Sequence, residues 1–275
     1  MLGESDTRRS SWLLLGGLGA TLVVIASWIQ NDGSAARGLS VTKWVEAAPL
    51  DGKLAIYETV FWEPLDTESL RKLLQDKPDF VRGKRILEIG TGSGLVALCC
   101  KHTGADHVVA TDINPNAVAC AKANSARLRL PLDVRLVPST PLDSEFSDQS
   151  QDSSAYVVIR DEEKFDLIVA NPPWEDATPK QWSDYALYDQ DFALLRSIIV
   201  GAKDHLKPGG RLVLVYGCVQ AIEIAQRLAA EHDFDCLILD DRDPQSLPSV
   251  FLPGMMLGLI PKTSLIPKPT GPEAQ

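Results

Sequence analysis

The stretch RILEIGTGSG, residues 85–94, joins a short apolar run to a turn that contains three glycines. The apolar run predicts a buried strand, and residues 95–102 have the composition of the helix that would follow it. Glycines let the backbone turn sharply and approach a ligand closely, because no side chain stands in the way. A strand, a glycine turn and a helix in this order indicate the first unit of a parallel α/β sheet.

Short apolar runs and helical patterns alternate along the rest of the chain, which is typical of an α/β fold. Asn114 and Pro115 suit the N-cap and the first position of a helix. A polar insertion is expected at 143–161, with an edge strand at 156–159. Further strands are expected at 108–111, 134–137, 165–170, 211–216, 236–239 and 255–260, and further helices at 191–206 and 222–230.

Composition predicts a single globular domain at 37–262, with residues 1–36 before it and a disordered tail at 263–275. The chain is 45% hydrophobic and 23% charged, which suits a packed core. Its net charge of −10 disfavours tight nonspecific binding to phosphate backbones. The histidines lack the spacing of metal ligands, so no metal site is expected. The cysteines form no CxxC pair, so buried, reduced thiols are expected.

The segment at 11–29, SWLLLGGLGATLVVIASWI, is uncharged and carries a tryptophan near each end. At about 1.5 Å per residue, a helix of this length nearly crosses a hydrocarbon core of about 30 Å. Tryptophans at both ends suit the membrane interfaces. We therefore expect an N-terminal transmembrane helix, with residues 1–36 as membrane anchor and linker of a single-pass protein. A cleaved signal peptide and a buried helix are the alternatives.

An acidic residue ends the second expected strand. Asp112 follows Gly94 by 18 residues, and a carboxylate there can accept hydrogen bonds from both hydroxyls of a ribose. A dinucleotide-binding G-x-G-x-x-G turn that starts at Gly90 would need a third glycine where this chain has Leu95. The glycine spacing therefore counts against a nicotinamide cofactor.

The tetrapeptide Asn171-Pro172-Pro173-Trp174 directly follows the fourth expected strand. Ligands of open α/β sheets lie beyond the carboxyl ends of the strands, so this loop should face the ligand. The Asn171 side-chain oxygen and the Pro172 carbonyl can each accept one N–H of a planar NH₂ group. The prolines stiffen the loop, and Trp174 can stack on a flat acceptor. An ordinary turn is the alternative, because Asn-Pro dipeptides are common turn signals.

Together these motifs resemble class I S-adenosylmethionine-dependent methyltransferases that carry an N/D-P-P-Y/F/W motif. That group includes the HemK/PrmC-type glutamine methyltransferases, with a methyltransferase small domain, and the adenine amino-methyltransferases of DNA and RNA. The resemblance covers roughly residues 57–216. It implies a Rossmann-like class I methyltransferase fold, with a mostly parallel seven-stranded sheet and helices on both faces.

The resemblance also implies the roles of individual residues. S-adenosylmethionine would be the cofactor, with Glu88 near its methionine moiety, Asp112 on the ribose and Ile113 on the adenine. Residues 60–67, VFWEPLDT, look like the segment that walls the HemK-type site, which makes Asp66 and Thr67 candidate substrate residues; a helix N-cap is the alternative. The full candidate set is Glu88, Gly90, Thr91, Gly92, Gly94, Asp112, Ile113 and Asn171 for the cofactor, and Asn171, Pro172, Pro173 and Trp174 for catalysis.

We therefore expect an N-methyltransferase that acts on a planar amide or amine nitrogen of a protein, glutamine-like, or of a small molecule. Its domain would lie in the cytoplasm, where the cofactor is made. The main alternative is an adenine amino-methyltransferase, which a basic strip near Lys122, Arg127 and Arg129 would favour. An NAD(P)-dependent oxidoreductase and a non-catalytic membrane-tethered binding protein are the alternatives from other classes. The intact Asn171 argues against the last.

Overall fold

The computed structural model describes residues 40–138 and 155–262. Its larger sheet is built from β3 (Arg85–Ile89), β4 (His107–Asp112), β5 (Asp133–Leu136), β6 (Phe165–Ala170), β7 (Leu206–Cys218), β8 (Phe234–Ile238) and β9 (Val250–Pro261). A hairpin consists of β1 (Val41–Val45) and β2 (Leu54–Tyr57). The helices are α1 (Glu68–Asp76), α2 (Leu95–His102), α3 (Pro115–Leu128), α4 (Ala193–His205) and α5 (Val219–Glu231). Short 3₁₀ turns are η1 (Pro78–Phe80), η2 (Trp182–Ala186), η3 (Gln190–Phe192) and η4 (Pro244–Ser246).

Within these residues the larger sheet has seven strands in the order β5-β4-β3-β6-β7-β9-β8. The first five strands in that order are parallel to one another. β9 lies between β7 and β8 and is antiparallel to both. The order reverses between β3 and β6, which is where ligands bind in open α/β sheets. The Rossmann-like sheet that the sequence predicts is therefore present.

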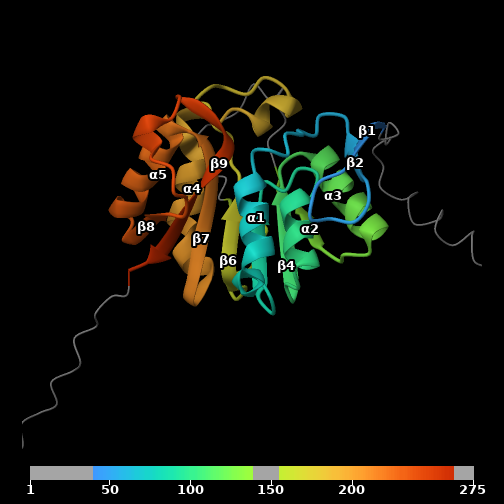
Figure 1. The fold of residues 1–275 in the computed structure, drawn as a ribbon, viewed down its shortest axis with the longest axis horizontal. Helices are drawn as coiled ribbons and strands as arrows, with labels where there is room; N and C mark the ends of the chain where they lie inside the picture. The colour runs from blue at the N-terminus through green and yellow to red at the C-terminus, as the bar shows by residue number, and fades with distance from the viewer. Residues whose placement is uncertain (1–39, 139–154, 263–275) are drawn as a thin grey trace, which may run out of the picture. The chain divides into compact units, whose positions relative to one another are not determined.

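Helices cover both faces of this sheet (Figure 1), because successive residues of a strand point to opposite sides. On one face α1, α2 and α3 share a core with Ile86 of β3, as Leu70 and Leu98 illustrate. On the other face α4 and α5 share a core with Leu87, as Ile198 illustrates. Two apolar layers thus hold the sheet rigid and leave its strand ends for the loops.

The expected transmembrane helix is corrected here, together with the single-pass membrane location built on it. No helix within residues 40–138 and 155–262 is long and apolar enough to cross a membrane. The longest helix there, α3, has 14 residues, or about 21 Å at 1.5 Å per residue, against a hydrocarbon core of about 30 Å. Residues 11–29, on which the prediction rested, lie outside the described residues, as does the expected tail at 263–275. Within the described residues the fold is therefore an α/β domain, and none of their helices could span a membrane.

The edge strand expected at 156–159 is also wrong. These residues form turns, and the buried Tyr156 ring stacks on His205 with ring centroids 4.6 Å apart. The Tyr156 hydroxyl donates a hydrogen bond of 2.8 Å to the carbonyl of Ile198 in α4. Tyr156 and Ile159 thus pack into the core that α4 and α5 share instead of extending the sheet.

A buried asparagine docks the β1–β2 hairpin, which the sequence does not predict. The Asn124 side chain of α3 accepts from the backbone N–H of Ala55 at 2.8 Å and donates to the Ala55 carbonyl at 2.9 Å. It also donates to the carbonyl of Ser93, just before α2, at 2.9 Å. One carboxamide therefore ties the hairpin, α3 and the glycine turn together.

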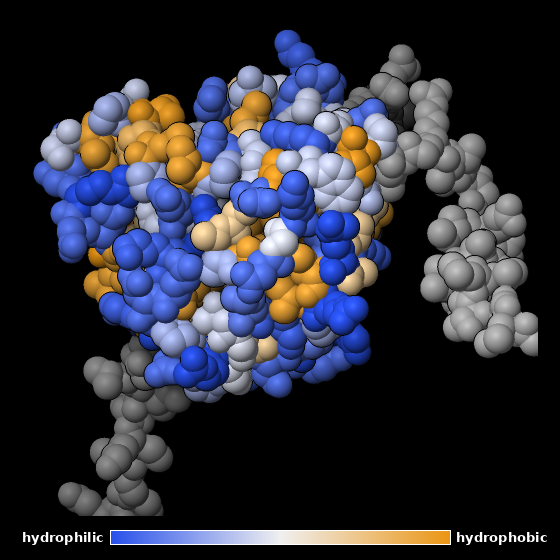
Figure 2. All heavy atoms as spheres, turned by 45° about the vertical axis from the view of Figure 1, so that its right-hand side comes forward, coloured by the Kyte–Doolittle hydropathy of each residue, from blue (hydrophilic) through white to orange (hydrophobic). Residues whose placement is uncertain are grey.

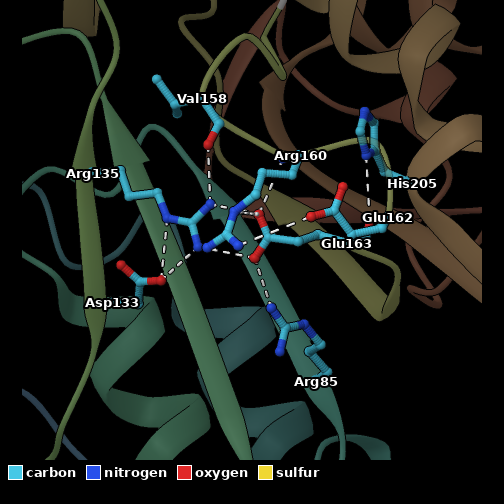
Figure 3. Close-up of polar contacts among 8 residues, drawn as sticks. All are labelled: Arg85, Asp133, Arg135, Val158, Arg160, Glu162, Glu163 and His205. Atoms are coloured by element: carbon cyan, nitrogen blue, oxygen red, sulfur yellow. Dashed lines mark hydrogen bonds and ion pairs between the residues drawn. The ribbon is translucent and has the colours of Figure 1, made fainter.

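An ion-pair network lies across β5, β3 and the loop before β6 (Figure 3). Its centre is the Glu163 carboxylate, whose side chain is only 8% exposed. Arg135 of β5 holds it with two hydrogen bonds of 2.7 and 2.9 Å, and Arg85 of β3 adds one of 2.8 Å. Asp133 accepts from Arg135 at 2.6 Å. These charge-assisted bonds hold the pKa of Glu163 down at about 2, against its ordinary value of 4.5.

The described surface is mainly hydrophilic on the side that Figure 2 shows, with several separate hydrophobic patches. Trp44 of β1 is one exposed aromatic residue, at 50%. The Arg127 guanidinium lies over its ring, 4.5 Å from the centroid, and donates to the Lys53 carbonyl at 3.0 Å. Arg127 therefore holds the hairpin against α3.

Candidate active site

Three neighbouring strands bring the predicted site residues to one edge of the sheet. Ile89 of β3 lies level with Thr111 of β4 and Ala170 of β6. Because these strands are parallel, the residues that follow them leave the sheet at the same edge. Those residues are Gly90, Asp112 and Asn171.

The glycine turn after β3 has a backbone that only glycine adopts readily. Gly90, Gly92 and Gly94 have φ values of +77°, +54° and +85°, in the left-handed region that disfavours side chains. A Cβ on Gly90 or Gly92 would meet no atom within 4 Å, so the turn presents bare backbone to open space. At Gly94 a Cβ would come within 3.2 Å of Ala121, so this glycine permits close packing of α3. The turn is thus shaped both for a ligand and for its own packing.

Glu88, near the end of β3, stabilises the turn through hydrogen bonds. Its buried carboxylate accepts from the Thr91 hydroxyl at 2.5 Å and from the Ala97 N–H, in the first turn of α2, at 3.1 Å. Burial, with a smaller effect from the nearby Asp112, raises the pKa of Glu88 to about 8 against these hydrogen bonds. Two of the expected cofactor residues, Glu88 and Thr91, are therefore bonded to each other.

Asp112 closes the turn from the β4 side. One carboxylate oxygen accepts from the Gly92 N–H at 2.8 Å, and the other accepts from the Asn114 N–H at 2.8 Å. A carboxylate can accept about four hydrogen bonds, so capacity remains for two ribose hydroxyls. Open space over Gly90 and free capacity on Asp112 fit a nucleoside ligand. Burial raises the pKa of Asp112.

The Asn171 loop lines a cavity of about 160 Å³. Asn171 contributes its carboxamide, and the oxygen accepts from the Trp174 indole N–H at 3.2 Å. The buried carboxylate of Asp66, from the segment before α1, lies on the same cavity, and the nearby Asn171 side chain opposes the rise in its pKa that burial causes. The residues that line the cavity are Phe61, Asp66, Asn171, Pro172, Trp174, Glu175, Ala186 and Leu187.

A family model described as the methyltransferase small domain matches residues 60–231. The chain belongs to the methyltransferase small domain family. This membership identifies it as an S-adenosylmethionine-dependent methyltransferase, with S-adenosylmethionine as its cofactor. The glycine turn and Asp112 agree with that cofactor, which has a ribose and no phosphate.

Two curated relatives carry the same printed description, release factor glutamine methyltransferase. The chain is 32% identical to the protein of Shewanella oneidensis over 174 residues, 59% of this chain and 55% of that one. It is 29% identical to the protein of Clostridium acetobutylicum over 178 residues, 60% of this chain and 58% of that one. The chain thus spans little more than half the length of these relatives.

Solved structures share the fold at low sequence identity. A T. thermophilus 16S rRNA methyltransferase, in complex with S-adenosylmethionine and guanosine, has a TM-score of 0.55 and 18% identity. The match covers 81% of this chain and 51% of that one. An Agrobacterium tumefaciens methyltransferase has a TM-score of 0.52 and 15% identity, with 83% and 72% covered. These likenesses concern the fold alone.

Not every residue that the sequence suggests for this methyltransferase site contacts the cavity. Thr67 is the N-cap residue of α1 without a side-chain capping bond, and it lies outside the cavity lining. Pro173 is buried and is not among the residues that line the cavity. Ile113 is half-buried directly after Asp112, where its side chain remains a candidate for contact with adenine.

Trp174 packs closely against β7, a contact that its expected stacking role did not include. A Cβ on Gly217, near the end of β7, would come within 2.3 Å of the Trp174 ring, so the indole lies directly on this glycine. Sequence reasoning did not single out Gly217. It also missed Leu187 as a cavity residue. The segment of Leu187 is closed by hydrogen bonds from the Glu175 N–H to the Leu187 carbonyl at 3.1 Å and from the Asp189 N–H to the Glu175 carbonyl at 2.9 Å. The only signal in the sequence was the nearness of this segment to Asn171.

Proposed function

We propose that this methyltransferase acts on a planar amide nitrogen, a glutamine-like side chain of a protein. The observation that carries the proposal is the position of the Asn171 carboxamide. It lines a small cavity and directly follows β6, the strand that pairs with β3, which leads into the glycine turn. The names of the two curated relatives support a glutamine acceptor. We propose residues 37–262 as the catalytic domain.

We infer that Gly90, Gly92 and Asp112 hold the cofactor, with the ribose on the Asp112 carboxylate. Ile113 would pack on the adenine. When bound, S-adenosylmethionine supplies an electrophilic methyl group on a sulfonium. Glu88 and Thr91 act indirectly in this proposal, because their mutual hydrogen bond holds the turn in shape.

The loop after β6 then has to orient a poor nucleophile. The lone pair of an amide nitrogen is delocalised, so it must be directed at the methyl carbon. The Asn171 oxygen and the Pro172 carbonyl would each accept one N–H of the acceptor, which fixes the plane of its NH₂ group. Positioning of this kind can lower a barrier by about 7–11 kcal/mol when the geometry is near attack. No strong general base is needed, because the N–H becomes acidic as the nitrogen is alkylated.

The cavity lining favours such an N–H donor. Asp66, Asn171 and Glu175 present acceptor oxygens, while Phe61 and Leu187 supply apolar walls. No Lys, Arg or His is among the described residues that line it. A neutral amide gains hydrogen bonds in such a site, whereas a phosphate or carboxylate is repelled.

The proposal can be tested with the full chain, radiolabelled S-adenosylmethionine and two peptides that differ only in Gln or Glu at one exposed position. We expect label on the Gln peptide alone, and none with Asn171→Ala. Glu163→Gln is the matched control, because Glu163 does not line the cavity, and it should retain methyl transfer. Equal labelling of the Gln and Glu peptides, or undiminished labelling by Asn171→Ala, would overturn the proposal.

Adenine in RNA or DNA is the second candidate acceptor. Lys122 and Arg129 line a shallow groove at the end of α3, which gives this candidate some support. Arg127, the third residue of the expected basic strip, is engaged by Trp44 and the Lys53 carbonyl. Label on an adenine-containing oligonucleotide and none on the Gln peptide would favour this candidate.

A further inference from the structure

Two side chains of opposite hydrogen-bonding character lie beside the Asn171 carboxamide. The Trp174 indole donates to its oxygen at 3.2 Å. The Asp66 carboxylate lies on the same cavity, where the Asn171 side chain favours its ionised form and so lowers its pKa. All three groups line the same cavity. They form a chain from the Asp66 segment to the catalytic loop.

The two partners together specify which way the carboxamide faces. The oxygen and NH₂ ends of an asparagine are nearly equal in size, so shape alone does not distinguish them. An indole N–H can only donate, and an ionised carboxylate can only accept. A flipped Asn171 would therefore place two donors together at Trp174 and two acceptors together at Asp66.

The backbone around Asp66 is fixed independently of Asn171. The Asp66 carbonyl accepts from the Gly254 N–H of β9 at 3.2 Å, and the Ser69 hydroxyl donates to the Gly254 carbonyl at 2.6 Å. The buried Arg71 of α1 donates to the Pro64 carbonyl at 2.7 Å. A Cβ on Gly254 would lie within 2.5 Å of the Asp66 carbonyl oxygen, so β9 fits tightly under this segment. Asp66 thus lies on a firm support.

We propose that Asp66 is a positioning residue, whose ionised carboxylate holds the Asn171 carboxamide with its oxygen available to the N–H of the methyl acceptor. The proposal rests on the proposed role of Asn171 and adds a requirement to it. Asp66 acts through Asn171, and Trp174 acts with it as the second partner.

This role predicts a dependence on pH. Burial, and after it the charge of Glu63, raise the pKa of Asp66 to about 6, against the lowering effect of the Asn171 side chain. Glu63 lies on the same segment, Glu175 lines the cavity, and the Arg71 guanidinium of α1 binds the Pro64 carbonyl. A protonated Asp66 can donate as well as accept, so it no longer selects one orientation of Asn171. Methyl transfer should therefore decline as the pH falls through about 6.

The first experiment needs no acceptor. Side-chain NH₂ signals of the full chain, labelled with ¹⁵N in asparagine, would be followed by NMR from pH 5 to pH 8, with Asn171→Ala used to assign the signal of residue 171. We expect this signal to titrate with a midpoint near 6 and to lose the titration in Asp66→Asn. A signal that is constant over this range in the wild-type chain would overturn the proposal.

The second experiment measures methyl transfer to the Gln peptide. Asp66→Asn should lower kcat by about 10- to 100-fold with an unchanged KM for S-adenosylmethionine, the loss expected from a slightly misplaced group. It should also remove the decline on the acid side. In the matched variant Glu63→Gln, kcat at neutral pH should be retained and the decline should move to lower pH, because a charge that raises the pKa of Asp66 is gone.

The outcomes separate this proposal from the proposed function. An Asp66→Asn variant that keeps the wild-type kcat and the wild-type acid decline would overturn the positioning role while the amide methyltransferase stands. A wild-type chain that labels no Gln peptide would overturn the proposed function, and the NMR titration would still decide whether Asp66 holds Asn171.

Discussion

Glu88, in β3, and Glu163, in the loop before β6, are both little exposed, at 5% and 8%. Glu88 lies under the glycine turn, where Thr91 and the Ala97 N–H are its hydrogen-bond donors, and desolvation raises its pKa to about 8. Glu163 lies between Arg85 and Arg135 (Figure 3), and the hydrogen bonds from Arg135 lower its pKa to about 2. Desolvation therefore decides the shift at Glu88, and a guanidinium partner decides it at Glu163.

The contrast extends to the other acids of the two regions. Asp66 and Asp112, like Glu88, lie near the carboxyl ends of the strands, and burial raises the pKa of each. The Glu163 region pairs its acid with guanidinium groups and serves stability. The cavity region leaves its acids to neutral donors, which suits the orientation of a neutral amide. Variants at each region should therefore change different properties.

The largest effect is expected from Asn171→Ala. It removes the oxygen that is proposed to hold the acceptor N–H, so methyl transfer should fall by about 1000-fold or more, as for loss of a group that acts in the transition state. Affinity for S-adenosylmethionine, measured by calorimetry, should stay within severalfold. Transfer near the wild-type rate would contradict the role of this loop.

Asp112→Asn tests the cofactor side of the same region. It removes the charge and one acceptor from the proposed ribose contact, so S-adenosylmethionine should bind about 10- to 100-fold more weakly, the usual cost of losing hydrogen bonds to a charged group. Calorimetric titration measures this directly. An unchanged dissociation constant would mean that the ribose lies elsewhere.

Glu163→Gln tests the other region. The change leaves Arg135 with Asp133 as its remaining carboxylate, so the free energy of unfolding should fall by about 2 kcal/mol at neutral pH. Since the pKa of Glu163 is lowered, its contribution is complete above its ordinary value of 4.5 and is lost as the pH falls towards about 2. The variant should therefore also lose this acid-side slope in urea titrations. The affinity for S-adenosylmethionine should not change. Weaker binding of S-adenosylmethionine by this variant would show that the two regions are coupled.

The last variant, Glu88→Gln, is expected to change the pH dependence of stability in the opposite direction. Because the pKa of Glu88 is raised from 4.5 to about 8, the folded state binds the proton more tightly, and stability declines as the pH rises between these values. Wild-type chain should lose about 1 kcal/mol per pH unit from this group in part of that window. The variant should show a flatter profile when unfolding is followed from pH 5 to pH 8. Parallel profiles of stability against pH for the wild type and Glu88→Gln would contradict the raised pKa of Glu88.

The meeting of Gly90, Asp112 and Asn171 could be predicted from the sequence, because strand patterns and the geometry of parallel sheets determine where strand ends lie. The contacts that complete the site could not. The cavity brings together Asn171 and Asp66, which are more than 100 positions apart, and the contact of Trp174 with Gly217 depends on how β7 packs. Local patterns contain no information about such pairs.

The errors have the same origin. The apolar residues at 156–159 have strand character, but the Tyr156 ring stacks on His205 and its hydroxyl bonds to α4. The hairpin was missed because it is docked by Asn124, 69 residues away from Ala55. The transmembrane prediction rested on the length, hydropathy and flanking tryptophans of one segment outside the described residues, and no helix of the described residues is long and apolar enough to span a membrane.

The central claim is that one edge of the sheet holds both the cofactor and the group that orients the acceptor. A crystal structure of the chain with S-adenosylhomocysteine tests it most directly. The account predicts the ribose hydroxyls on the Asp112 carboxylate and the sulfur facing the Asn171 cavity, with room for one planar nitrogen between sulfur and carboxamide oxygen. A ligand bound away from Gly90 and Asp112, or a sulfur separated from that cavity by the protein backbone, would contradict it.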